Sequence, residues 1–96
     1  MTARFTWNKD KASRNLRDHK ISFETAKNAF SDPYVRYLED CEIDGEVRHH
    51  AIGFVNERLM ALVVFVYQSD DNEEIIHIIS ARKADAFEES VYADQF

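Results

Sequence analysis

A nine-residue apolar run from Leu59 to Tyr67 restricts the folds that this 96-residue chain can adopt. Successive side chains of a strand point to opposite faces, so a run that is apolar at every position favours a central strand covered on both sides. The run is about half as long as a bilayer-spanning helix, and the first residues lack the apolar core of a signal peptide. We therefore expect one small cytoplasmic domain over residues 1–96, without a membrane segment.

The residues before this run predict a short strand followed by two helices. Phe5 to Trp7 is typical of a strand, and Asn8 is placed to cap a helix from about Lys9 to Asp18. Ser22 is a second N-cap candidate, and Pro33 prevents the helix that it begins from continuing.

The residues after Pro33 predict strands and a final helix. Segments at Tyr34–Leu38, Arg48–Val55 and Ile75–Ile79 surround the central run and are joined to it by short turns or loops. Asp85 and Glu88 have the spacing of a capping box for a C-terminal helix. The expected class is α+β, with a small antiparallel sheet of about four strands, two N-terminal helices and one C-terminal helix.

Charge is unevenly distributed along the chain. The formal net charge is −6, yet the residues up to Lys27 hold seven basic and three acidic side chains, against five and fifteen in the remainder. A basic segment of this kind marks a polyanion-binding face or a solvated helix. The single cysteine, Cys41, cannot form an internal disulfide, which fits a reducing compartment.

Short motifs run through the chain in a fixed order. The most specific are a string that opens with Trp7, Lys11 and Asn15 and continues His19-x-Ile21-Ser22-Phe23, and the later string Ile78-Ile79-Ser80-Ala81-Arg82. Together with Phe30-x-Asp32-Pro33, Glu46-x-Arg48 and Tyr67, these motifs resemble the BrnT family, the toxins of a bacterial type II toxin–antitoxin system.

The resemblance covers essentially the whole chain and has definite implications. It implies a RelE-like fold and a metal-independent endoribonuclease that blocks translation. It also implies neutralisation by a BrnA-like antitoxin, with contact to DNA only through that partner. No His, Cys and Asp cluster has metal-site spacing, so we expect neither a metal nor a cofactor.

Such a reaction needs a base for the 2′-hydroxyl, an acid for the leaving 5′-oxygen and cations on the phosphate. Histidine suits the proton transfers, and the planar fork of arginine suits the phosphate. The predicted catalytic residues are Lys11, His19, Arg48, Tyr67 and Arg82, and the predicted additional RNA contacts are Lys9, Arg14 and His77.

Each of these residues also has a plain structural interpretation. Lys11 and His19 share a helical stripe that could simply be solvated, and Arg82 could form a salt bridge. Tyr67 could be a core residue with a surface-seeking hydroxyl. The adjacent His49 and His50 should point to opposite faces of a strand and so cannot form a metal pair.

Some positions depart from the family pattern. His77 stands where the family usually has arginine, Gln68 and Ser69 replace a frequent arginine, and Glu89 replaces the arginine of a Glu-Arg pair. Each change removes positive charge, which weakens the attraction for RNA. The alternative function is therefore a catalytically degenerate module that binds an antitoxin-like DNA-binding partner and acts in transcriptional regulation.

Overall fold

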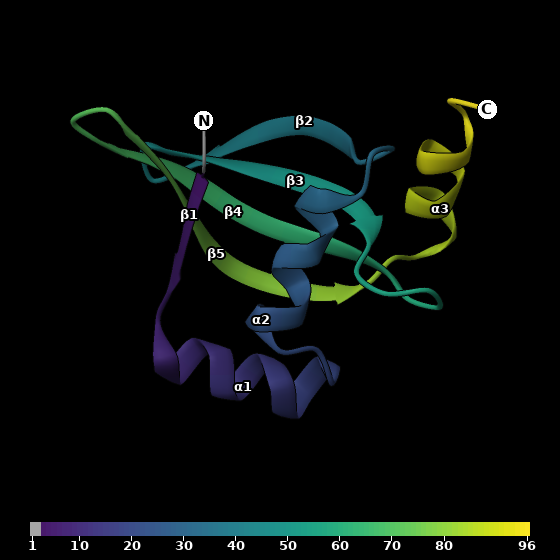
Figure 1. Ribbon diagram of the computed structural model, residues 1–96, viewed down its shortest axis with the longest axis horizontal. Helices are drawn as coiled ribbons and strands as arrows, with labels where there is room; N and C mark the ends of the chain where they lie inside the picture. Colours follow the sequence, from purple (N-terminus) through teal and green to yellow (C-terminus); the bar gives the residue numbers. More distant parts are fainter. Residues whose placement is uncertain (1–2) are drawn as a thin grey trace.

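The computed structural model describes residues 3–96, apart from the side chains of Ala3, Glu39, Asp40 and Asp70. Its centre is a five-stranded sheet with the strand order β1-β5-β4-β3-β2 (Figure 1). The strands are β1 (Ala3–Trp7), β2 (Arg36–Ile43), β3 (Glu46–Phe54), β4 (Met60–Asp70) and β5 (Glu73–Lys83). The helices are α1 (Lys9–His19), α2 (Phe23–Ala26), the 3-10 helix η1 (Lys27–Ser31) and α3 (Ala86–Ala93).

The α+β class is confirmed, but the predicted sheet was wrong in two respects. It has five strands rather than about four, and it is mixed rather than antiparallel, because β1 pairs with β5 in parallel. Strand β1 lies along the outer edge of β5, with Phe5 opposite Ile76 and Trp7 opposite Ile78. By pairing there, β1 covers the backbone groups of β5 that would otherwise form an open edge of the sheet.

The helix ends follow the predicted caps. The side chain of Asn8 accepts a hydrogen bond from the Lys11 backbone N–H at 3.0 Å, and α1 ends where Lys20 adopts a left-handed conformation. The second N-terminal helix begins after Ser22 as predicted, but it is a single α-helical turn that continues as η1. The capping box of α3 is present.

Strand β4 is covered by helices along one side and at one end of the other, so the coverage on both sides that the apolar run predicted is present only in part. Its odd-numbered residues face α1, α2 and η1, with Val63 and Phe65 fully buried there. We call this side the helical face. The opposite side, the open face, receives α3 at one end, where Tyr92 packs with Ile52 and Leu62. In the described part of the chain, no other helix covers the open face (Figure 1).

A β-bulge at Ile79 decides which side chains reach the open face. Val64 pairs with Ser80, whereas Phe65 pairs with Ile78, so Ile79 is an extra residue in β5. The bulge reverses the alternation along the rest of the strand. Ala81 is therefore buried on the helical face, and Arg82 lies on the open face beside Leu62.

Helix α3 is attached to the body of the protein by a buried polar contact. The hydroxyl of Tyr92 donates a hydrogen bond to Asp32 at 2.8 Å, and the same carboxylate accepts from the backbone N–H groups of Phe54 and Tyr34, each at 2.9 Å. Burial pushes the pKa of Asp32 upward, but these three hydrogen bonds outweigh it and hold the pKa below its usual value. Burial and the contact with Asp32 raise the pKa of Tyr92 to about 12.

The Tyr92 contact predicts a loss of stability in strong alkali. An unfolded tyrosine titrates near pH 10, so the contribution of Tyr92 is complete below about pH 10 and is lost as the pH rises through about 12. Tyr92→Phe should flatten this decline in the free energy of unfolding, measured by urea denaturation between pH 9 and 12. Tyr34→Phe, at a half-exposed ring, should leave the decline in place; equal slopes for all three proteins would contradict the assignment.

Candidate active site on the open face of the sheet

Side chains of neighbouring strands form rows across the open face. In the first row, Thr6 pairs with His77 and His77 pairs with Val66. Arg48 continues this row, because it lies one position beyond the His49–Phe65 pair. The sheet thus brings the predicted catalytic residue Arg48 and the predicted RNA contact His77 to the same face from strands that are not adjacent.

Two further rows follow toward α3. The second row contains Ser80, Val64, His50 and Leu38, and the third contains Arg82, Leu62, Ile52 and Arg36. Adjacent strands lie about 4.8 Å apart, so side chains on β3 and β5 are separated by about 10 Å. We call these rows the strip: apolar side chains of β4, of which Leu62 and Val66 are buried, lie between the side chains of β3 and β5, which we call its two walls.

Two nitrogen atoms on the β3 wall lack a hydrogen-bond partner within the described part of the chain. They are Nε of Arg48 and Nδ1 of His50, and both are buried. Nε of Arg48 lies 3.6 Å from a carboxylate oxygen of Glu46, which is within ion-pair range but too long for a hydrogen bond. A buried, unpaired nitrogen is costly, so these two side chains are not fully satisfied by the described part of the chain.

His77 on the β5 wall is held in position. The hydroxyl of Thr6 lies 2.8 Å from Nδ1 of His77. Either atom can be the donor, depending on the tautomer of the ring. Because Nδ1 is engaged, Nε2 is the ring nitrogen available to a ligand.

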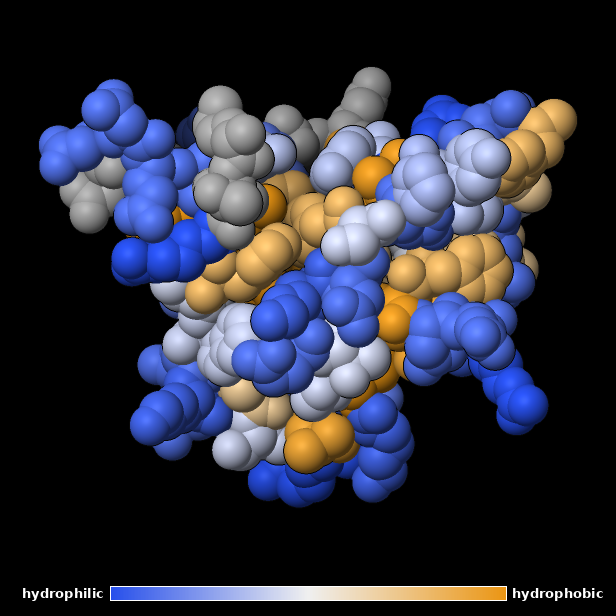
Figure 2. Space-filling model, in the orientation of Figure 1, coloured by the Kyte–Doolittle hydropathy of each residue, from blue (hydrophilic) through white to orange (hydrophobic). Residues whose placement is uncertain are grey.

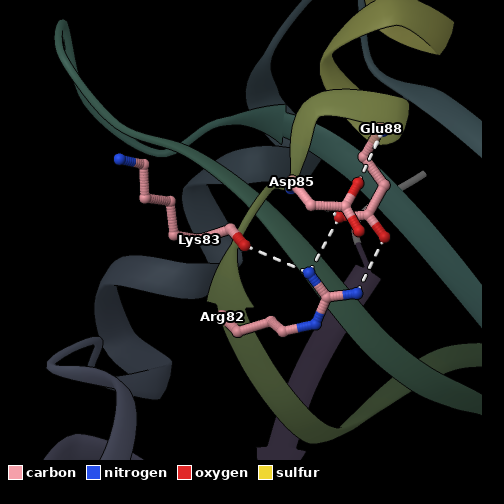
Figure 3. Close-up of polar contacts among 4 residues, drawn as sticks. All are labelled: Arg82, Lys83, Asp85 and Glu88. Carbon is pink, nitrogen blue, oxygen red and sulfur yellow. Dashed lines mark hydrogen bonds and ion pairs between the residues drawn. The ribbon is translucent and has the colours of Figure 1, made fainter.

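Arg82 forms the salt bridge that its structural interpretation described (Figure 3). Its two terminal nitrogens donate to the Glu88 carboxylate at 2.8 and 2.7 Å, and one of them also donates to the Lys83 carbonyl. The hydrogen bonds to Glu88 raise the pKa of Arg82 and outweigh the opposing effect of burial. Glu88 is 5% exposed and also accepts from the Asp85 backbone N–H. Arg82 therefore joins β5 to α3 at the end of the strip, while 41% of its side chain stays exposed.

The predicted site residues on α1 lie apart from the strip. Lys11, Arg14 and His19 line a shallow, open depression of about 270 Å³ beside Ile79, together with Asp18 and Asn15. Lys9 is exposed on the first turn of the same helix, outside this depression. Asp18 is paired with Arg17 at 3.0 Å, and this hydrogen bond lowers the pKa of the Asp18 carboxyl.

Asn15 in the same stripe is a structural residue. It is 6% exposed, and its amide donates to the carbonyls of Ile21 and Ala81, both at 2.9 Å. Its side-chain oxygen accepts from the Ala81 backbone N–H at 3.1 Å. The side chain therefore pairs with β5 in the manner of a strand, beyond the point at which β1 ends at Trp7.

Tyr67 lies on the helical face, away from Arg48 and His77. Its ring packs against His49 and Phe65, with centroid distances of 4.7 and 5.3 Å, and half of its surface is exposed. The five predicted catalytic residues thus occupy three places: α1, the helical face and the open face. In the view of Figure 2, hydrophilic side chains dominate the surface and apolar ones form small, separate areas.

The sequence analysis missed two residues of the strip, Arg36 and His50. The opposite orientation of His49 and His50 was predicted and is confirmed, since His49 stacks on Phe65 while His50 lies in the row of Val64. The alternation of Arg48 and His50 along β3 could have indicated a shared polar face. Arg36 could be assigned only once the pairing of β2 with β3 was known.

Arginine and histidine side chains on a sheet face that a helix covers only at one end define a small α+β protein suited to binding a polyanion. A family model described as "Ribonuclease toxin, BrnT, of type II toxin-antitoxin system" matches residues 7–88. The chain belongs to this family.

A solved structure supports the fold. The crystal structure of the Brucella abortus ribonuclease toxin BrnT matches with a TM-score of 0.66 and 23% sequence identity, over 88% of this chain and 99% of that one. No curated protein matches. Among the described residues, no helix is long and apolar enough to cross a bilayer.

Proposed function

We propose that this protein is a metal-independent endoribonuclease toxin that acts in the cytoplasm, inhibits translation and is neutralised by a BrnA-like antitoxin. The proposal includes a RelE-like fold and places cleavage on the strip of the open face. The observation that carries it is the convergence of Arg48, His77 and Arg82 on one face. The arginines would stabilise the phosphate as negative charge develops on it, and an imidazole would transfer a proton.

The depression on α1 supports a path for the rest of the RNA. Ile79, which lines it, directly precedes Ser80 of the strip. On α1, Arg14 lies on the side opposite Ala12. Ala12 packs against the core of the helical face, whereas Arg14 lines the depression. Lys9, Lys11, Arg14 and His19 would then contact flanking phosphates rather than the reacting one, which makes their contribution mainly one of affinity.

Cleavage of a mixed-sequence RNA in EDTA tests the proposal. The wild-type protein should cleave at a rate that the chelator does not change, and Arg48→Ala should cleave at least about a hundredfold more slowly. Arg58→Ala is the matched control, because Arg58 is an exposed arginine at the β3–β4 turn. It should stay within about twofold of wild type. Absence of cleavage by the wild type, or dependence on metal, would contradict the proposal.

Two observations favour a second function, a catalytically degenerate module that binds an antitoxin-like partner and regulates transcription. The guanidinium of Arg82 is already occupied by Glu88, and the net charge of −6 opposes RNA binding. This alternative predicts that induction of the chain alone leaves growth unchanged. The toxin predicts growth arrest that Arg48→Ala relieves at an equal protein level.

A further inference from the structure

We propose that His50 is a catalytic residue, which transfers a proton on one side of the reacting phosphate while His77 does so on the other. The proposal rests on the proposed ribonuclease function and assigns the second proton-transfer group at the same site. It is carried by the placement of the two rings on opposite walls of the strip. Because Nδ1 of His50 is buried, Nε2 is the nitrogen that would exchange the proton.

The positions of the two histidines fit a single phosphodiester. His50 lies on β3 and His77 on β5, with β4 between them. Two strand spacings of about 4.8 Å and a step of one row place their backbones roughly 12 Å apart. Both side chains rise from the same face, so a phosphodiester held over Val64, which is only partly buried, would have one imidazole on each side.

This arrangement suits an in-line displacement. The 2′-oxygen forms a bond to phosphorus while the bond from phosphorus to the 5′-oxygen breaks. One imidazole takes the proton of the 2′-hydroxyl and the other, in its protonated form, gives a proton to the departing 5′-oxygen. The products are a 2′,3′-cyclic phosphate and a 5′-hydroxyl, and no other reactant is consumed. Attacking and leaving oxygens lie on opposite sides of phosphorus, so a proton-transfer group is needed on each side.

The two rings differ in how their Nδ1 atoms are bonded within the protein. Thr6 restricts the ring of His77 through Nδ1. No group in the described part of the chain bonds Nδ1 of His50, although this atom is buried. Arg48 precedes His50 by two residues on the same face, where its guanidinium can contact the phosphate that His50 would serve.

The test compares two adjacent histidines of β3. His50→Gln keeps an amide that can hydrogen-bond but cannot transfer a proton at neutral pH, and His49→Gln makes the same change on the helical face. Cleavage is measured with an RNA oligonucleotide, and binding with its 2′-O-methyl analogue, which lacks the attacking hydroxyl. We expect His50→Gln to cleave at least about a hundredfold more slowly with analogue binding within about threefold. His49→Gln should behave as wild type.

Other outcomes separate this proposal from the ribonuclease assignment. Wild-type cleavage together with near-wild-type cleavage by His50→Gln would overturn the role of His50 and leave the ribonuclease function standing. Parallel losses of binding and cleavage would also overturn it, because they indicate a binding role alone. An inactive wild-type protein would overturn both. His50→Asn serves as a second variant in case His50→Gln does not fold. Thermal unfolding is used to verify that each variant compared is folded.

Discussion

Arg82→Ala is expected to slow RNA cleavage at least about a hundredfold and to lower the free energy of unfolding by about 2 kcal/mol. The stability effect follows from Glu88, which is 5% exposed and would lose both hydrogen bonds from the guanidinium. A buried carboxylate left without its cation is strongly unfavourable. The cleavage effect follows from the position of Arg82 at the end of the strip. Urea denaturation and the RNA assay measure the two effects separately.

A paired substitution distinguishes the two roles of Arg82. Arg82→Met combined with Glu88→Gln removes both charges while keeping side chains of similar size, and the glutamine can still accept from the Asp85 backbone N–H. Stability should recover by at least half of the loss. Cleavage should not recover if Arg82 contacts the phosphate. Recovery of both would show that Arg82 acts only by holding α3 against β5.

Asn15→Ala should lower the free energy of unfolding by about 3 kcal/mol, because it leaves three backbone groups without their partner. These are the carbonyls of Ile21 and Ala81 and the N–H of Ala81. The end of α1 should separate from β5, and hydrogen exchange at Ala81 should accelerate strongly. Chemical denaturation measures the first effect, and exchange followed by NMR measures the second.

The control for Asn15 is Asn28→Ala. Asn28 is exposed, and its one hydrogen bond in the described structure, to the Val55 carbonyl, is long at 3.4 Å. Its loss should cost less than about 0.5 kcal/mol. Similar losses at Asn15 and Asn28 would mean that the buried amide contributes little to joining α1 and β5.

Local chemistry made part of the fold predictable. Asn8 and Ser22 cap helices in the structure because a short oxygen-bearing side chain next to an apolar periodic segment satisfies the first backbone N–H groups. The Leu59–Tyr67 run falls on the middle strand of the five, where neighbouring strands on both edges and the helical face bury the most apolar surface. These signals lie within a few residues of the feature they specify.

The features that sequence reasoning missed depend on distant segments. The parallel pairing of β1 joins Phe5 to Ile76, and no local pattern shows that choice of partner. The bulge at Ile79 is invisible in a run of β-branched residues, although it decides that Arg82 faces α3. The sequence analysis therefore identified arginines and histidines of the site but could not sort them among the two faces and α1.

The parallel pair of β1 and β5 also has a consequence for the timing of assembly. On a ribosome, Thr6 emerges early but cannot meet His77 until β5 has been synthesised and has left the exit tunnel. Contacts between segments so distant in sequence form slowly, because a long loop must close first. A partly synthesised chain therefore carries α1 without the completed strip. This order delays completion of the strip until most of the polypeptide has been made.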